Sequence, residues 1–180
     1  MDKCRIISIL MAAGVLILYW ASGSRAADIE TKYATITYHD QQDLRRFNDK
    51  LDIGRYSYQV KAGLGDTIES EIISKIDFIV EKVMAVLDMF PVSLKFSIVI
   101  RPTEKEVQKD FRDIYRVDVT YIAFYSPNQN KVFYSVDNAN IKVVAHEIGH
   151  VIVENYFNIS PPQRIHEVLA QFAAKHIMME

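Results

Sequence analysis

The sequence has little of several residue types that mark special classes of protein. Its 180 residues include 6 glycines, 5 prolines and one cysteine, Cys4. Collagen-like and low-complexity chains are rich in glycine or proline, and a disulfide framework needs several cysteines, so none of these is expected. An excess of charge of one sign is also lacking, because 21 Lys and Arg face 23 Asp and Glu. Proteins that bind nucleic acids usually carry an excess of positive charge, so we expect no nucleic-acid partner.

The first residues differ in character from the rest of the chain. Residues 1–5 carry two positive charges, residues 6–21 form an almost unbroken apolar run, and residues 22–27 are small apart from Arg25. This order is typical of a secretory signal peptide. We therefore expect residues 1–26 to be a signal peptide and the protein to be exported, either periplasmic or secreted. The alternative is an uncleaved membrane anchor facing outside the cytoplasm, although a bilayer span needs about 20 apolar residues.

The remaining residues, 27–180, have the size of one domain that buries its own core. The composition of the whole chain, 49% hydrophobic and 24% charged, is ordinary for a globular protein. Cys4 lies in the segment that would be removed, so the mature domain is expected to have neither disulfides nor cysteine chemistry.

Hydrophobic periodicity predicts helices interleaved with strands. The predicted strands are residues 31–38, 55–60, 94–100, 120–126 and 131–136, the last two forming a hairpin. The predicted helices are residues 40–51, 66–90, 102–114, 138–156 and 164–178. The second helix is expected to begin with a capping box at residues 66–69, and Asp137 or Asn138 is expected to cap the fourth. This order predicts an α+β domain with a small, mostly antiparallel sheet.

A pentapeptide near the end of the chain carries the strongest chemical signal. Residues 146–150 read His-Glu-Ile-Gly-His, an H-E-x-x-H motif, inside a predicted helix. A spacing of four places the imidazoles of His146 and His150 on one helix face, where both reach one Zn²⁺ at about 2.0–2.1 Å. Glu147 stands beside them and is therefore the candidate general base for a zinc-activated water.

A zinc site of this kind needs a third protein ligand. The extended motif H-E-x-x-H-x-x-G-x-x-H requires glycine at position 153 and histidine at 156, but the chain has Val153 and Tyr156, which excludes it. The other solution takes a glutamate from a second helix, and Glu167, beyond a break at residues 158–162, is the candidate. Ala170 is small enough to let the two helices approach. The packing residues predicted beside it are Leu169, Phe172 and Ala173.

These two stretches resemble the glutamate-zincins (gluzincins), the clan of thermolysin-like and peptidase MA-like zinc metallopeptidases. Residues 162–172 resemble the family's glutamate helix, commonly P-x-W-[LF]-x-E-G-x-A-x-[YF], with Arg164 and Val168 departing at its Trp and its Gly. The resemblance implies a zincin-like domain in which residues 121–125, or the hairpin partner 131–136, align a peptide substrate. It also implies one Zn²⁺ with Glu147 as general base and three ligands: His146, His150 and Glu167.

Two departures from the family bear on activity. Gln171 lies one helical turn after Glu167, where many relatives carry a carboxylate that orients a ligand histidine; the amide oxygen of Gln171 is expected to accept this hydrogen bond with a weaker effect. The sequence ends soon after Glu167, without the downstream His or Tyr that stabilises the tetrahedral intermediate in larger relatives. An oxyanion donor is therefore expected from elsewhere. The candidates, for which packing is the more usual role, are Tyr121, Tyr125, Tyr134 and Tyr156.

Three further polar residues have plainer interpretations. His166 adjoins Glu167 and so points elsewhere on its helix, where we expect a surface role or a substrate contact rather than metal ligation. His176 lies too far along the helix axis for the same metal and is expected at the surface. Glu154 continues the histidine face, and we expect it at a solvated helix end.

The sequence thus predicts an exported zinc peptidase that hydrolyses peptide bonds with Glu147 as general base. Its partner would be a peptide or protein substrate, with a membrane involved only through an uncleaved N-terminal segment. Two other hypotheses stay open. One is a non-catalytic zinc-binding module of the cell envelope that recognises peptides or proteins, and the other is an interaction domain without a metal.

Overall fold

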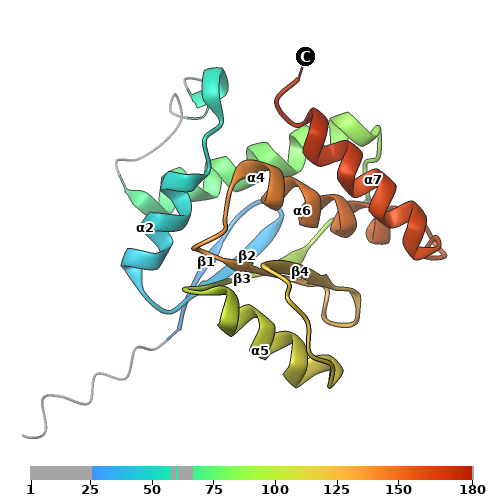
Figure 1. Ribbon diagram of the computed structural model, residues 1–180. Coiled ribbons are helices and arrows are strands. Elements are labelled where there is room, and N and C mark those ends of the chain that lie inside the picture. The colour runs from blue at the N-terminus through green and yellow to red at the C-terminus, as the bar shows by residue number, and fades with distance from the viewer. Residues whose placement is uncertain (1–25, 58–59, 61–66, 180) are drawn as a thin grey trace, which may run out of the picture.

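The computed structural model describes residues 26–57, 60 and 67–179, and the predicted signal peptide lies almost entirely outside them (Figure 1). The described part is an α+β domain with a five-stranded sheet in the order β1-β2-β3-β5-β4. The strands are β1 (Ala27–Glu30), β2 (Ala34–Tyr38), β3 (Phe96–Arg101), β4 (Ala123–Ser126) and β5 (Lys131–Ser135). The helices are α2 (Gln41–Lys50), α4 (Ile68–Leu87), α5 (Glu104–Tyr115), α6 (Ile141–Tyr156) and α7 (Gln163–His176). Two short 3₁₀ turns are η2 (Gly54–Tyr56) and η3 (Pro127–Gln129).

The sheet is mixed, so the prediction of a mostly antiparallel sheet is wrong. β1 pairs antiparallel with β2, and β4 pairs antiparallel with β5, but β3 runs parallel to both β2 and β5. Parallel neighbours need a crossover connection, usually helical. The chain supplies two, because α2 and α4 lie between β2 and β3, and α5 lies between β3 and β5. The predicted hairpin is confirmed as β4-η3-β5, which leaves β4 at the edge of the sheet.

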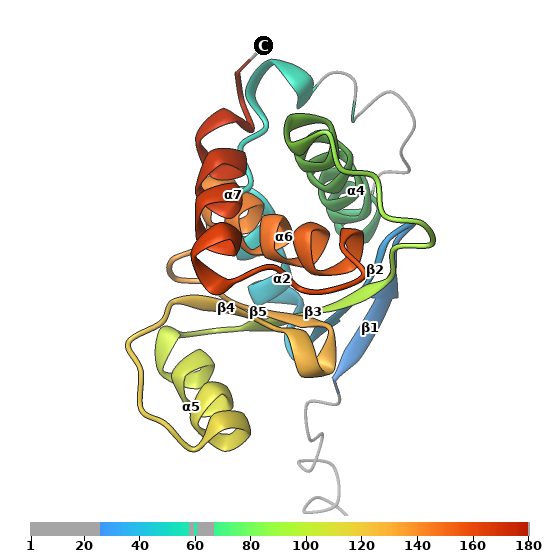
Figure 2. The same ribbon diagram turned by 90° about the vertical axis from the view of Figure 1, so that its right-hand side faces the viewer.

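Helices cover both faces of the sheet, with α5 alone on one face and α2, α4, α6 and α7 on the other (Figure 2). The alternation of β3 explains the two layers. Ile98 and Ile100 are buried in the main core with α2, α4 and α6, whereas Val99 between them packs on the α5 side with Val107. None of the helices in the described ranges is long and apolar enough to cross a membrane.

One predicted strand is replaced by helical structure. Residues 55–60 are not a strand: the chain forms η2 after Gly54, which has φ of 53° and whose N–H is bound by the Asp52 carboxylate, and Ser57 is helical as well. Residues 58 and 59 of that prediction lie outside the described residues. A positive φ favours glycine and interrupts an extended run, which explains the local change.

Helix α4 begins and ends at other residues than the pattern predicts. Its capping box uses Thr67 and Ser70 rather than residues 66–69, and Asp88, with φ of 52°, ends it before Pro91. A left-handed residue terminates a helix because it diverts the chain from the helical path. Phe90, predicted to continue the apolar stripe of this helix, is therefore outside the core and 58% exposed.

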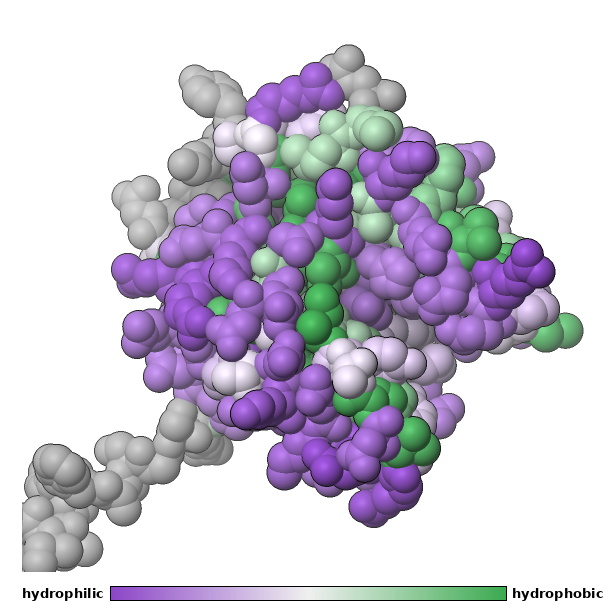
Figure 3. Space-filling view, viewed as in Figure 1, coloured by the Kyte–Doolittle hydropathy of each residue, from purple (hydrophilic) through white to green (hydrophobic). Residues whose placement is uncertain are grey.

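The outer side of α7 is more apolar than the prediction implies. Ala170 and Ala173 are buried, but Ile165, Val168 and Phe172 are exposed, so Phe172 is not the core residue that was expected. Hydrophobic side chains are visible at the surface over α7 and near the end of α5 (Figure 3). Helix α7 therefore packs on the domain mainly through its small residues.

Candidate metal centre

Helix α6 presents the H-E-x-x-H motif because one of its faces is anchored in the core. Asn140 caps it, with Oδ1 accepting hydrogen bonds from the N–H groups of Lys142 and Val143, so the predicted caps Asp137 and Asn138 are displaced by a few residues. Val144 and Ile148 are fully buried in the main core. The face that carries His146 and His150 is thereby turned toward α7 and the cleft beside it.

Helix α7 approaches α6 at the glycine inside the motif. A Cβ atom on Gly149 would lie 2.9 Å from Cα of Ala170, and 3.5 Å from Cβ of Ala173. Real side chains do not tolerate the first distance, so position 149 requires glycine at this helix crossing. The expectation that Ala170 lets the two helices approach is confirmed. The matching role of Gly149 on the facing helix was not predicted from the sequence.

The crossing brings three predicted ligands together. Nε2 of His146 lies 3.2 Å from Nε2 of His150, and the two carboxylate oxygens of Glu167 lie 3.6 Å and 3.5 Å from these nitrogens. Four tetrahedral ligands at zinc distances of about 2.0–2.1 Å are separated by about 3.3–3.4 Å. The three residues also form the group of His, Asp and Glu side chains in the described residues that could hold a metal. One donor atom from each residue lies within 4.8 Å of the other two, which is close enough for the group to hold one metal ion.

Burial sets the protonation of the two histidines. Desolvation lowers the pKa of His146, and the negative charge of Glu167 opposes this only in part. Desolvation, reinforced by His146, lowers the pKa of His150 to about 4. Both imidazoles are thus neutral at pH 7, which is the form that binds a metal. Gln163 donates a hydrogen bond of 3.0 Å from Nε2 to Glu167 Oε1 and so steadies the third ligand.

Glu147 is as buried as His150 and more buried than His146 and Glu167. Its side chain is buried, and desolvation together with the charge of Glu167 raises its pKa to about 8, while a backbone hydrogen bond from Tyr125 opposes the shift. Tyr125 belongs to β4, so the candidate general base sits between the motif helix and the edge strand. A carboxylate with a pKa near neutral is suited to accept and return a proton.

The free edge of β4 faces the same cleft. The N–H of Ser135 donates a hydrogen bond to the carbonyl of Ile122, which shows which residues of β4 turn their backbone groups toward β5. Backbone groups alternate in an antiparallel pair, so those of Ala123 and Tyr125 point away from β5. Ala123, Phe124 and Tyr125 line a cleft of about 490 Å³ that also holds His146, Glu147, His150 and Glu167.

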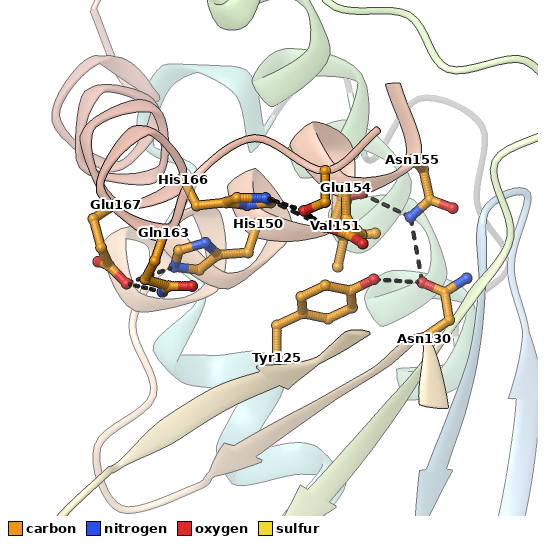
Figure 4. Close-up of polar contacts among 10 residues, drawn as sticks. Tyr125, Asn130, His150, Val151, Glu154, Asn155, Gln163, His166 and Glu167 are labelled. Carbon is orange, nitrogen blue, oxygen red and sulfur yellow. Dashed lines mark hydrogen bonds and ion pairs between the residues drawn. The ribbon is translucent and has the colours of Figure 1, made fainter. Parts of the chain in front are cut away.

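The surface interpretation of His166 needs correction. His166 is 6% exposed, and its Nε2 lies 3.2 Å from Glu154 Oε2 and 3.1 Å from Ser160 Oγ. Ser160 donates to the same glutamate oxygen at 2.6 Å. The His166 ring also stacks on that of His150 at 5.9 Å between centroids (Figure 4). His166 is therefore not a surface group, because the turn between α6 and α7 folds back onto it. Glu154 lies near the end of α6 and stays 27% exposed, as expected of a solvated helix end.

The candidate tyrosines, His176 and Gln171 occupy different environments. Tyr134 is fully buried and its hydroxyl donates to the Val144 carbonyl at 3.0 Å, whereas the Tyr125 hydroxyl donates to Asn130 Oδ1 at 2.9 Å. Tyr121 and Tyr125 line the cleft, but Tyr156 does not.

His176 stacks on Phe172 away from the ligands, as its expected surface place implies. Within the described part of the chain, Gln171 makes no hydrogen bond to His146 or His150, so its expected orienting role is wrong.

The fold and the site were compared with known proteins. No protein-family model, curated protein or solved structure matches the chain.

Proposed function

We propose that this protein is an exported zinc-dependent peptidase with a zincin-like domain. The observation that carries the proposal is the triangle of His146, His150 and Glu167, whose donor atoms are 3.2–3.6 Å apart. Two neutral imidazoles and one carboxylate are a typical ligand set for catalytic zinc, which keeps one position open. Export is proposed on the N-terminal sequence, as a cleaved signal peptide or as an uncleaved anchor.

The chemistry divides between the metal and Glu147. A zinc ion bound here supplies Lewis acidity, which polarises a carbonyl oxygen and lowers the pKa of a water toward about 7. Glu147 accepts the proton of the attacking water and returns it to the nitrogen of the leaving amine. Its buried position in the cleft, beside the ligand histidines, places its carboxylate where it can take and return that proton.

The edge strand positions the substrate in this proposal. An extended peptide adds to β4 as a further strand, using the outward-facing backbone groups of Ala123 and the carbonyl of Tyr125, whose N–H is already bound to Glu147. Because Tyr125 also contacts Glu147, the peptide bond nearest to this residue is brought to the base.

The proposal is tested with the full-length chain loaded with zinc and a broad peptide library. We expect hydrolysis that a chelator abolishes and that added zinc restores. Glu147→Gln is expected to retain zinc and lose turnover, whereas Glu106→Gln, an exposed residue on α5, serves as the matched control. Turnover that survives in Glu147→Gln would overturn the role of this residue, and turnover indifferent to the chelator would overturn the metal mechanism.

A second candidate function is a zinc-binding envelope module that recognises peptides without cleaving them. It is favoured by the hydroxyls of Tyr125 and Tyr134, which are engaged by Asn130 and Val144 and so do not supply an oxyanion donor. Bound zinc together with no hydrolysis across the library would select this function.

A further inference from the structure

The cleft carries one carboxylate that neither metal ligation nor proton transfer uses. Three glutamates line it: Glu147, Glu154 and Glu167. The lining has no Lys or Arg among the described residues. Glu167 is the proposed metal ligand and Glu147 the proposed general base. Glu154 is the one glutamate of the cleft without a role in that chemistry.

Glu154 is held in place with one oxygen still available. Ser160 and His166 both contact Oε2, at 2.6 Å and 3.2 Å, and both can donate a hydrogen bond to it. Within the described part of the chain, Oε1 has no hydrogen-bond or ion-pair partner, and the side chain is 27% exposed. A carboxylate held by two donors at one oxygen presents its second oxygen to a cation in the cleft.

A second metal ion does not explain this arrangement. Glu154 and His166 supply only two strong donors, and a protein zinc site takes three or four. The described residues contain one group of three such side chains, and it is the triangle already described. An organic cation, which a single carboxylate and its neighbours can bind, fits the site better.

Glu154, on α6, lies beside one end of β4, and this decides which side of a bound peptide it faces. Burial raises the pKa of Tyr125, and the charge of Glu154 raises it further, so the two side chains are neighbours. Asn155, next to Glu154, binds Asn130, which follows β4 in the chain (Figure 4). Glu154 therefore lies toward the carboxyl end of β4, one turn of α6 or about 6 Å beyond His150.

The other end of the cleft is aromatic. Phe111 contacts Tyr121 and Phe124 edge to face, with ring centroids 5.1 Å and 5.0 Å apart. All three line the cleft, and Tyr121 lies two residues before the first residue of β4. The cleft thus has an apolar end at the start of the edge strand and an anionic end beyond it.

We propose that Glu154, supported by Ser160 and His166, binds a cationic group of the substrate on the amino-terminal side of the cleaved bond. This rests on the proposed peptidase function. Antiparallel pairing with β4 is the more stable alignment, and it places the amino-terminal part of a peptide beside the carboxyl end of the strand. A rise of about 3.3 Å per residue puts the cation about two residues from the reaction site. The cation is either a Lys or Arg side chain or a free terminal ammonium.

The test uses peptides that differ only in charge. One series scans lysine against norleucine along both sides of the cleaved bond, and each peptide is made with a free and with an acetylated amino terminus. Wild type is expected to prefer a cation on the amino-terminal side by about tenfold in kcat/KM, since hydrogen bonds between charged partners are the stronger ones. A preference for lysine indicates that a side chain supplies the cation, and a preference for the free over the acetylated amino terminus indicates that the terminal ammonium does.

Variants separate recognition from a merely structural network. Glu154→Gln, which keeps the shape of the side chain, is expected to bring the lysine-to-norleucine ratio near one, whereas Glu106→Gln keeps the wild-type ratio. A ratio near one in wild type, a ratio unchanged in Glu154→Gln, or a preference confined to the carboxyl-terminal side would each overturn the proposal.

A binding measurement keeps this inference apart from the peptidase proposal. The same peptides, carrying a fluorophore, are titrated with full-length wild type and Glu154→Gln. Tighter binding of cationic peptides by wild type alone supports the site even if no peptide is cleaved, in which case only the peptidase function fails. No difference between the two proteins, with or without cleavage, overturns the site.

Discussion

Gly149 of α6 lies against the backbone of Ala170 of α7, so closely that a Cβ atom on the glycine would come within 2.9 Å of the alanine Cα. This contact lies one residue before His150 and three residues after Glu167, so it sets the distance between the two helices at the ligands. The glycine inside the H-E-x-x-H motif therefore has a packing role in addition to its place in the motif.

Gly149→Ala should destabilise the protein and weaken zinc binding together. The added methyl group meets a backbone atom that cannot rotate away, and overpacking of this kind costs about 1–3 kcal/mol. Intrinsic helix propensity alone would favour alanine by about 1 kcal/mol, so the sign of the effect is diagnostic. Denaturant unfolding and zinc titration measure both quantities. A variant as stable as wild type, with equal zinc affinity, would contradict the close crossing.

The metal-free protein should lose stability as the pH rises, because of Glu147. Its pKa is raised from 4.5 to about 8, so between these values the folded state binds more protons than the unfolded chain. The free energy of unfolding therefore falls as pH rises through this window. Urea unfolding of metal-free wild type and Glu147→Gln between pH 5 and 9 measures the difference, and the histidine contributions are common to both. Parallel curves for the two proteins would show that Glu147 is not perturbed.

Tyr134→Phe should lower stability without removing catalytic chemistry. The substitution deletes the buried hydrogen bond to the Val144 carbonyl, which is worth about 1 kcal/mol and leaves that carbonyl without its side-chain donor. Because the hydroxyl is committed to this bond, we expect kcat to change little in the assay for peptide hydrolysis. A loss of about 100-fold in kcat would instead identify Tyr134 as an oxyanion donor.

Local patterns predict the parts of this structure that local physics decides. Val144, Ile148 and Val151 recur at helical spacing, so the helix that carries the motif follows from periodicity, and the predicted hairpin at β4 and β5 is confirmed. The candidate set of His146, His150 and Glu167 follows from helix geometry and the need for a third ligand, and the structure brings their donor atoms together.

Long-range arrangement accounts for what the sequence did not reveal. The parallel pairing of β3 with β2 and β5 depends on how the crossovers pack, and no residue of β3 encodes its neighbours. His166 looks like a surface residue because it adjoins Glu167, yet the turn at Ser160 folds over it. One signal was present in the motif itself: a glycine inside a buried helix often marks a close approach by another backbone.

The most direct test of the account is the zinc content of the purified full-length protein. Wild type and Gln171→Ala should each contain about one zinc per chain, because Gln171 is exposed and does not contact the ligands. Glu167→Ala should lose most of its zinc, since two histidines alone leave the site short of a ligand. Wild type without stoichiometric zinc, or Glu167→Ala with as much zinc as wild type, would contradict the proposed metal centre.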